Sequence, residues 1–239
     1  SFWNTVIPES DSKMINRHII SHGIDLRLST NLSEIIEDEN GRAKAIRTDK
    51  NEIIPCQFVG LTVGVRPNID FIKHTSIATN KGILVNKYLE TSQTDIYAVG
   101  DCAEQQEPLP GRRPIEAVWY TGRMMGETLA KTLTGKKTAY QPGHWFNSAK
   151  FFDIEYQTYG LVAARPTKVE IHFHWEDSEK NVGITIAINK STNEFLGINS
   201  FGIRLRHEIF DQFLTEKRSV FHVLEHLNDC NFDPEFFTH

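Results

Sequence analysis

A glycine followed by an aspartate, at the end of an apolar run, is the pattern in this sequence that most favours a binding site. Residues 95–99 read as a short apolar strand, and Gly100-Asp101 follow it directly. Open α/β sheets bind ligands at the carboxyl ends of their strands. Gly100 would let a ligand approach the backbone closely, and the Asp101 carboxylate can accept hydrogen bonds from a sugar or polyol hydroxyl. A strand that simply ends in a Gly-Asp turn is the alternative interpretation.

Histidine and cysteine side chains are the other candidates for chemistry. His172 and His174 share one face of a predicted strand, and His222 and His226 share one face of a predicted helix, which are spacings that zinc could use. No cysteine accompanies either pair, so ordinary half-buried histidines are favoured and we expect no metal site. Cys102 has no base beside it in the sequence, which favours a small buried side chain over a nucleophile. We therefore assign no catalytic residue.

The glycines exclude two kinds of phosphate-binding loop. No two of the 15 glycines are separated by a single residue, so Gly-x-Gly-x-x-Gly does not occur. A Gly-Lys-Ser/Thr sequence, as in a P-loop, is also absent. Nucleotide phosphates must therefore be bound by something other than these residues. Arg112 and Arg113, in a Pro/Gly-rich loop, could meet a phosphate or an acidic partner protein, but a solvated loop is favoured.

Composition places the chain among ordinary globular proteins. The 239 residues are 39% hydrophobic and 24% charged, with a net charge of −5. This charge gives no electrostatic reason to bind nucleic acid or an anionic membrane, and no apolar run is long enough to span a bilayer. Three scattered cysteines do not form a disulfide framework, and no signal peptide opens the chain. We therefore expect a cytoplasmic protein.

The hydrophobic pattern predicts α/β and α+β parts with a boundary near residues 140–144. A helix capped by Asp11 or Ser12 should open the chain, and an Asn40-Gly41 turn should close a hairpin. Strands are predicted at 24–28, 32–37, 43–48, 53–54, 57–65, 82–85 and 95–99, with a helix over 115–133. Residues 168–176, 183–189 and 194–200 should form one antiparallel sheet before a helical region over 204–227. In this sheet Phe173, Trp175, Ile184, Ile186 and Ile188 should face the core because of their period of two.

Several segments together resemble one family in the correct order. The segment Thr-x-x-x-x-Ile-Tyr-Ala-x-Gly-Asp over 91–101 is similar to the second FAD-binding signature of the pyridine nucleotide-disulfide oxidoreductase superfamily. Residues 60–68 resemble the loop by which these proteins pass from the NAD domain back to the FAD domain. Residues 82–86 look like the Gly-Ile-x-Val-Asp strand of the family, with Asn86 in place of the acid. Residues 115–119 and 147–160 resemble the helix start and the interface domain of the ferredoxin- and rubredoxin-reductase branch.

The resemblance implies a domain arrangement and a site. Residues 1–66 would be the tail of an NAD(P)-binding domain, 67–140 the second half of an FAD-binding domain, and 141–239 a C-terminal interface or dimerisation domain. The fold would thus combine the carboxyl-terminal portions of two Rossmann-like domains with an antiparallel α+β domain. Gly100 and Asp101 would contact the flavin ribitol, and Val118 and Trp119 the pyrimidine edge of the flavin. Trp119 as an anchor of the helix core is the alternative.

The implied function is that of an FAD-dependent NAD(P)H oxidoreductase, seen as its carboxyl-terminal part. Both Gly-rich nucleotide motifs of the family would lie upstream of Ser1, so we expect this chain alone to be inactive. No dithiol is visible, which favours an acceptor such as an iron–sulfur protein, rubredoxin, oxygen or a quinone. Apolar surface near Phe58, Val63, Ile96 and Ala98 should be uncovered, which predicts a homo-oligomer or a second polypeptide. The alternative function is a non-catalytic dimerisation or partner-binding fragment without flavin.

Overall fold

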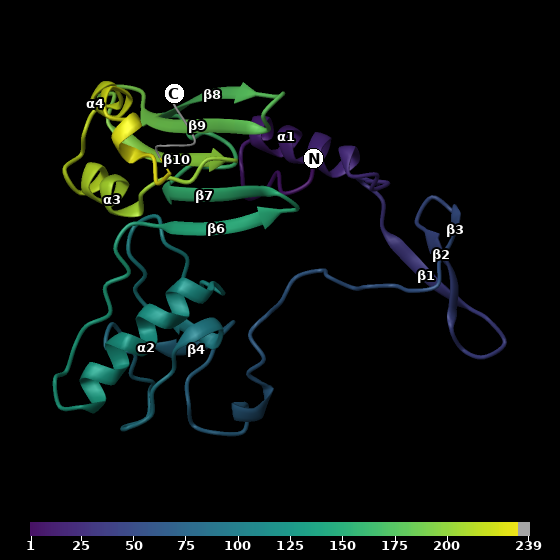
Figure 1. The fold of residues 1–239 in the computed structure, drawn as a ribbon. Helices are drawn as coiled ribbons and strands as arrows, with labels where there is room; N and C mark the ends of the chain where they lie inside the picture. The colour runs from purple at the N-terminus through teal and green to yellow at the C-terminus, as the bar shows by residue number, and fades with distance from the viewer. Residues whose placement is uncertain (234–239) are drawn as a thin grey trace.

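A five-stranded antiparallel sheet dominates the carboxyl-terminal half of the computed structural model, which describes residues 1–233 (Figure 1). Its strand order is β6-β7-β10-β9-β8. The strands are β6 (Phe146–Phe151), β7 (Ile154–Gly160), β8 (Glu170–Asp177), β9 (Val182–Asn189) and β10 (Phe195–Phe201). The predicted antiparallel sheet of the last three strands is confirmed, with Phe173 opposite Ile186 and Trp175 opposite Ile184. A shift of one residue would move these side chains to the opposite face of the sheet, so the alternation of apolar residues specifies the register.

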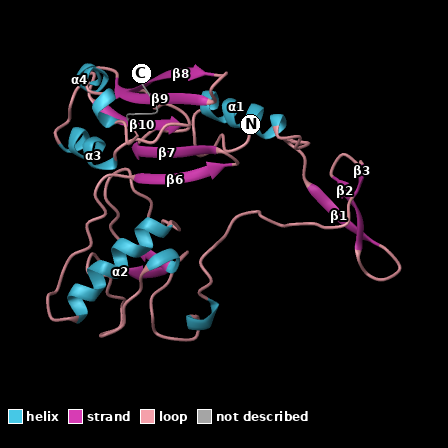
Figure 2. Ribbon diagram, viewed as in Figure 1, coloured by secondary structure: helices cyan, strands magenta, loops and turns pink. Residues whose placement is uncertain are grey.

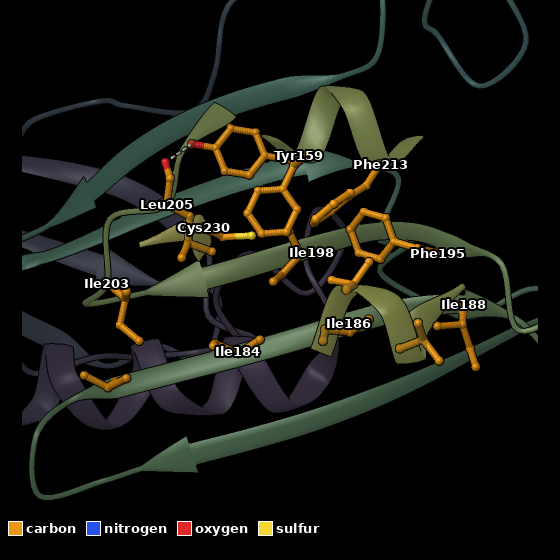
Figure 3. Packing of buried hydrophobic residues seen from close by; sticks show 14 residues of the cluster. Tyr159, Ile184, Ile186, Ile188, Phe195, Ile198, Ile203, Leu205, Phe213 and Cys230 are labelled. Carbon is orange, nitrogen blue, oxygen red and sulfur yellow. Dashed lines mark hydrogen bonds between the residues drawn. The ribbon is translucent and has the colours of Figure 1, made fainter. Parts of the chain in front are cut away.

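Two short helices cover one face of this sheet. They are α3 (His207–Thr215) and α4 (Val220–Glu225), followed by the 3₁₀ turn η3 (Asn228–Cys230). The core beneath them brings together apolar side chains of β7, β9, β10 and the helices, including Tyr159, Ile186, Ile198 and Phe210 (Figure 3). The Tyr159 hydroxyl donates a hydrogen bond to the carbonyl oxygen of Leu205 at 2.9 Å, which satisfies the one polar atom that this ring brings into the core.

Two of the five residues predicted to enter this core do not. Ile184, Ile186 and Ile188 are buried, whereas Phe173 is 56% exposed and Trp175 is 54% exposed. Their face is correct, because each pairs with a buried isoleucine of β9. The reason for their exposure is that β8 is the edge strand, and α4 leaves an apolar groove beside it.

The first helix, α1 (Glu9–Ser21), covers the other face of the sheet. Met14, Ile15 and Ile19 of the helix pack with apolar side chains of β7 and β10. The expected cap by Asp11 or Ser12 is wrong, since the helix begins earlier and Pro8 is its N-cap. Asp11 is instead fully buried, and it accepts hydrogen bonds from Thr185 and Asn199.

The predicted hairpin is confirmed, and two strands beside it are not. A three-stranded sheet has the order β1 (Leu32–Glu37), β2 (Ala43–Thr48) and β3 (Ile53–Pro55). Gly41, with φ +74°, lies in the connecting turn. Residues 24–28 and 57–65 are not strands, and the second segment runs as an extended connection (Figure 2). Phe58 and Val63 are 85% and 92% exposed, because no strand within residues 1–233 pairs with or covers this run.

A smaller part of the chain carries the segment with the Gly-Asp pair. Here β4 (Ile83–Val85) pairs in parallel with β5 (Ala103–Gln105). The other elements are the 3₁₀ turns η1 (Asp70–Ile72) and η2 (Gly100–Cys102) and the helix α2 (Trp119–Leu133). The predicted strand at 95–99 is wrong, because its only pairing is an isolated bridge between Tyr97 and Glu90. The helix predicted from residue 115 begins at Trp119. Of the surface predicted to be uncovered, Ile96 is 43% exposed and Ala98 is buried.

Candidate functional site

The Gly100-Asp101 pair forms a tight turn that rests on helix α2. Gly100 has φ +78°, a conformation that glycine adopts at little cost. Its backbone N–H donates to the sulfur of Met125 at 3.3 Å. A Cβ atom added to Gly122 would lie 3.5 Å from the Cα atom of Gly100, so the two glycines let the helix and the turn touch through their backbones. The helix therefore fixes the turn in place.

The Asp101 carboxylate is exposed and free to accept hydrogen bonds. Within residues 1–233 it has no hydrogen-bonding or ionic partner. The space beside Gly100 is also open, because a Cβ atom added there would meet no atom within 4 Å. A carboxylate next to an accessible backbone can receive a polyol chain, since each hydroxyl can donate to one of its oxygens. The ligand-binding role of Gly100 and Asp101 stays a prediction.

The start of helix α2 leaves its first amides without a side-chain cap. Val118 is the N-cap residue, in an extended conformation, and no side chain accepts a hydrogen bond there. Free N–H groups and the positive end of the helix dipole attract negative charge. Trp119 is 68% exposed, and its ring contacts that of its helix neighbour Tyr120 and, through a cation–π contact, the guanidinium of Arg123. The alternative interpretation of Trp119 as a core anchor is wrong.

The four predicted residues lie on two elements that contact each other. Gly100 and Asp101 belong to η2, and Val118 and Trp119 begin α2, which packs on η2. The N–H of Gly122 donates to the carbonyl oxygen of Val118 at 3.1 Å, so the uncapped helix start is one turn from the glycine contact. An acidic acceptor and a positive helix end therefore stand near one another across a small open surface.

A buried ion pair orients this helix start, and the sequence did not predict it. Arg112 donates to both carboxylate oxygens of Glu116, with nitrogen–oxygen distances of 2.6 Å and 2.5 Å. The two side chains are only 9% and 8% exposed, so the expectation that Arg112 lies in a solvated loop is wrong. Arg112 also donates to the carbonyl oxygen of Gly143 at 2.9 Å and lies over the ring of Trp145. The i,i+4 spacing of an arginine and a glutamate was the available signal.

A second buried carboxylate holds the strand that follows the turn, β5, against the start of β4. Glu104 on β5 accepts hydrogen bonds from the N–H of Gly82 at 2.7 Å and from the Asn80 amide at 2.8 Å. Gly82 is required there, because a Cβ atom would come within 2.7 Å of the Cys102 carbonyl oxygen. Cys102 itself is half-buried and unbridged. These contacts fix the backbone that follows Asp101.

Comparison with known proteins identifies relatives over the same residues. The family described as pyridine nucleotide-disulphide oxidoreductase matches residues 4–126. A rhodocoxin reductase from Rhodococcus erythropolis is 33% identical over 150 residues, which are 62% of this chain and 34% of that protein. A rubredoxin-NAD(+) reductase from Acinetobacter baylyi is 28% identical over 198 residues, which are 82% of this chain and 47% of that protein. The chain thus spans less than half the length of these curated relatives.

Solved structures share the fold at low sequence identity. An FAD-dependent pyridine nucleotide-disulphide oxidoreductase from Desulfovibrio vulgaris has a TM-score of 0.74 at 20% identity, covering 94% of this chain and 57% of that one. The covalent putidaredoxin reductase–putidaredoxin complex has a TM-score of 0.73 at 16% identity, covering 88% of this chain and 49% of that one. Within residues 1–233, no helix is both long and apolar enough to cross a membrane.

Proposed function

We propose that this chain, which belongs to the pyridine nucleotide-disulphide oxidoreductase family, supplies one half of the FAD site of an NAD(P)H-dependent reductase. The observation that carries this proposal is the open Gly100-Asp101 turn packed against the uncapped start of α2. The family is FAD-dependent and uses NAD(P)H. FAD, when bound, supplies the chemistry: it takes a hydride from NAD(P)H and passes electrons to an acceptor. The residues of this chain would bind FAD and orient it.

Asp101 is proposed to accept hydrogen bonds from the ribitol hydroxyls. Its carboxylate is exposed and unpaired within residues 1–233, so binding a polyol would break no existing hydrogen bond of this side chain. Gly100 contributes by leaving open space beside the backbone. Val118 and Trp119 are proposed to meet the pyrimidine edge, where the positive end of α2 would stabilise negative charge on the reduced ring. No residue of the chain is proposed to transfer a proton or a covalent group.

The phosphate-binding half of the site is absent from these residues. Without a Gly-x-Gly turn, the chain has neither of the loops that hold the FAD and NAD pyrophosphates in dinucleotide-binding folds. We propose that residues 1–66 end an NAD(P)-binding domain, 67–140 complete an FAD-binding domain, and 141–239 form an interface domain. The isolated chain should therefore bind FAD weakly and should not oxidise NAD(P)H.

The electron acceptor is proposed to be a small redox protein. The names of two relatives refer to a rubredoxin and to rhodocoxin, and one similar structure is a complex of a reductase with putidaredoxin. The acceptor of the present protein would then be a carrier of the ferredoxin or rubredoxin type. The test is an assay that measures reduction of such a carrier protein. Electron transfer to oxygen or a quinone alone, with no reduced carrier formed, would exclude this part of the proposal.

A non-catalytic role in association is the second candidate. Phe58, Val63 and Val65 are almost fully exposed along the extended connection, and isolated domains rarely keep such apolar surface uncovered. This observation supports a homo-oligomer or a second polypeptide that buries the segment. Visible absorption distinguishes the two functions, because a protein with bound flavin absorbs visible light and a protein that only associates with a partner does not.

The test of the flavin site is an Asp101→Ala variant of the complete protein. Removing the carboxylate should weaken FAD binding by about 1–3 kcal/mol, the cost of losing charge-assisted hydrogen bonds. This loss corresponds to roughly 5- to 150-fold in the dissociation constant, measured by flavin fluorescence. Glu39→Ala is the matched control, because it removes an equally exposed carboxylate from the β1–β2 turn. Equal FAD affinity of the Asp101→Ala variant and the unmodified protein would refute the assignment.

A further inference from the structure

A cluster of two histidines and an aspartate joins helix α1 to the β6–β7 turn. His18 and His22 are one helical turn apart at the end of α1, and Asp153 lies in the turn 135 residues further along the chain. The Nε2 atom of His18 is 2.6 Å from Oδ1 of Asp153, and the Nε2 atom of His22 is 3.4 Å from the same oxygen. All three potential ligand atoms lie within 4.8 Å of one another.

The hydrogen bond of His22 leaves a lone pair pointing into this cluster. Its Nδ1 atom is 3.0 Å from the backbone carbonyl oxygen of His18, and a carbonyl can only accept, so Nδ1 carries the proton. In the neutral ring, Nε2 then has no proton and faces the carboxylate of Asp153. Two acceptors that face each other need a cation between them or an additional proton. A histidine whose Nδ1–H is bound to a backbone carbonyl is also the usual arrangement of a metal ligand.

Burial of His18 and stacking of His22 on Phe152 position the two imidazole rings. The side chain of His18 is 3% exposed, and its Nδ1 atom is buried without a hydrogen-bond partner within residues 1–233. Because the Asp153 carboxylate can only accept, Nε2 of His18 carries the proton in their 2.6 Å contact. A metal ion bound there requires that proton to leave or to move to Nδ1, which has no partner within residues 1–233. The ring of His22 stacks on Phe152 at a centroid distance of 4.3 Å and an interplanar angle of 8°. Phe152 has φ +56°, a backbone conformation that turns the chain so that Asp153 meets the helix.

We propose that His18, His22 and Asp153 bind a divalent transition-metal ion such as zinc. Two imidazole nitrogens and one carboxylate oxygen suit zinc, whereas calcium and magnesium prefer oxygen ligands. The ion would coordinate Nε2 of both histidines and Oδ1 of Asp153, with water completing the shell. It fastens α1 to the five-stranded sheet at a point where apolar packing already brings them together. The proposed flavin site contains none of these residues, so the two proposals fail independently.

A second group also brings three possible ligand atoms together, from His222, Glu225 and His226. One of its residues must be replaced in the test so that this group does not bind zinc. All three of these residues belong to one short helical end, and none is as buried as His18. The test therefore uses the full 239-residue chain with His226→Asn as the parent protein. Zinc binding is measured by competition with a chromophoric chelator, and thermal unfolding is followed with and without zinc.

The parent should bind one zinc ion and unfold at a higher temperature when zinc is present. Adding His22→Ala or Asp153→Asn should weaken zinc binding by more than about tenfold, because even the loss of a residue that only supports a metal ligand costs at least about tenfold. Either variant should also abolish the zinc-dependent rise in the unfolding temperature. His22 and Asp153 are partly exposed, so these variants should fold, and circular dichroism without zinc verifies this. His144→Ala is the matched control, since it removes a histidine paired with the single carboxylate of Asp211.

Two results would overturn the proposal. A parent protein that binds no zinc would show that the cluster is only a set of contacts between the two histidines and Asp153. Zinc binding that His22→Ala and Asp153→Asn leave as tight as in the parent would place the ion elsewhere. Cobalt(II) in place of zinc gives an additional readout, because its visible spectrum should change in both variants and stay the same in His144→Ala.

Discussion

Replacing Arg112 by alanine should be the most damaging single change near the proposed flavin site. The guanidinium makes two hydrogen bonds to Glu116 and further ones to the carbonyl oxygens of Gly143 and Pro142. Arg112→Ala removes the ionic partner of the Glu116 side chain, which is 8% exposed in the intact pair. Removing one member of a buried ion pair costs about 3–5 kcal/mol, because the remaining charge stays desolvated. The free energy of unfolding should fall by this amount.

The chain contains a matched control for this loss. Arg123 and Glu127 form another i,i+4 pair, this one within helix α2, with a nitrogen–oxygen distance of 2.8 Å, but both side chains are about 60% exposed. Arg123→Ala should therefore cost only about 0.3–0.5 kcal/mol, as exposed helical pairs do. Urea unfolding followed by tryptophan fluorescence suits the comparison, since Trp145 lies beneath Arg112.

A double variant distinguishes a buried charge from lost packing. Arg112→Met together with Glu116→Leu removes both charges and keeps most of the buried volume, so much of the lost stability should return. The free energy of unfolding should differ clearly between Arg112→Ala and Arg123→Ala. A loss below about 1 kcal/mol for Arg112→Ala, or an equal loss in both variants, would refute the view that the Arg112–Glu116 pair is desolvated and fixes the start of α2.

Two further predictions concern stability. Gly160→Ala should lower the free energy of unfolding by more than about 2 kcal/mol, because φ is +72° and the new Cβ atom would clash with the Leu196 carbonyl oxygen. Gly126→Ala in α2 meets no atom within 4 Å and should raise the free energy of unfolding by about 0.5–1 kcal/mol. Equal effects of the two variants in urea unfolding would contradict both assignments. The hydrogen bond to Asp11 raises the pKa of His174 above its ordinary 6.5, so this pair stabilises the fold fully below that value and loses its contribution as the pH rises through the higher folded pKa. Unfolding measured from about pH 6 to pH 8 should show this decline in the unmodified chain and a smaller one in His174→Gln, and parallel profiles would contradict the pairing.

Features determined by neighbouring residues could be predicted from the sequence. The Asn40-Gly41 turn placed the hairpin correctly because the turn residues themselves set its geometry. Alternation likewise placed Ile184 and Ile186 on the buried face of β9. The same rule assigned Phe173 and Trp175 to that face but could not show that α4 stops short of the edge strand. An alternating pattern predicts which way a side chain points, and only the tertiary packing determines what covers it.

Features that depend on distant residues could not be predicted. The apolar run at 57–65 indicates a buried strand only if another strand pairs with it, and none within residues 1–233 does. The Arg112–Glu116 pair was visible as a spacing, but its burial depends on Gly143 and Trp145 in the next part of the chain. The candidate site itself was found because Gly100 and Asp101 are adjacent and lie within a recognisable signature.

The most direct test of the half-site is a titration of FAD into the mass-verified 239-residue chain and into an extended protein in which a Gly-rich dinucleotide-binding half is joined to it. The account predicts that only the extended protein binds FAD stoichiometrically and turns yellow, and that NADH bleaches this colour by reducing the flavin. Asp101→Ala should weaken FAD binding by the extended protein. Stoichiometric binding and NADH-driven bleaching by the 239-residue chain alone would contradict the account, because it would mean that these residues hold the FAD phosphates without a Gly-rich turn.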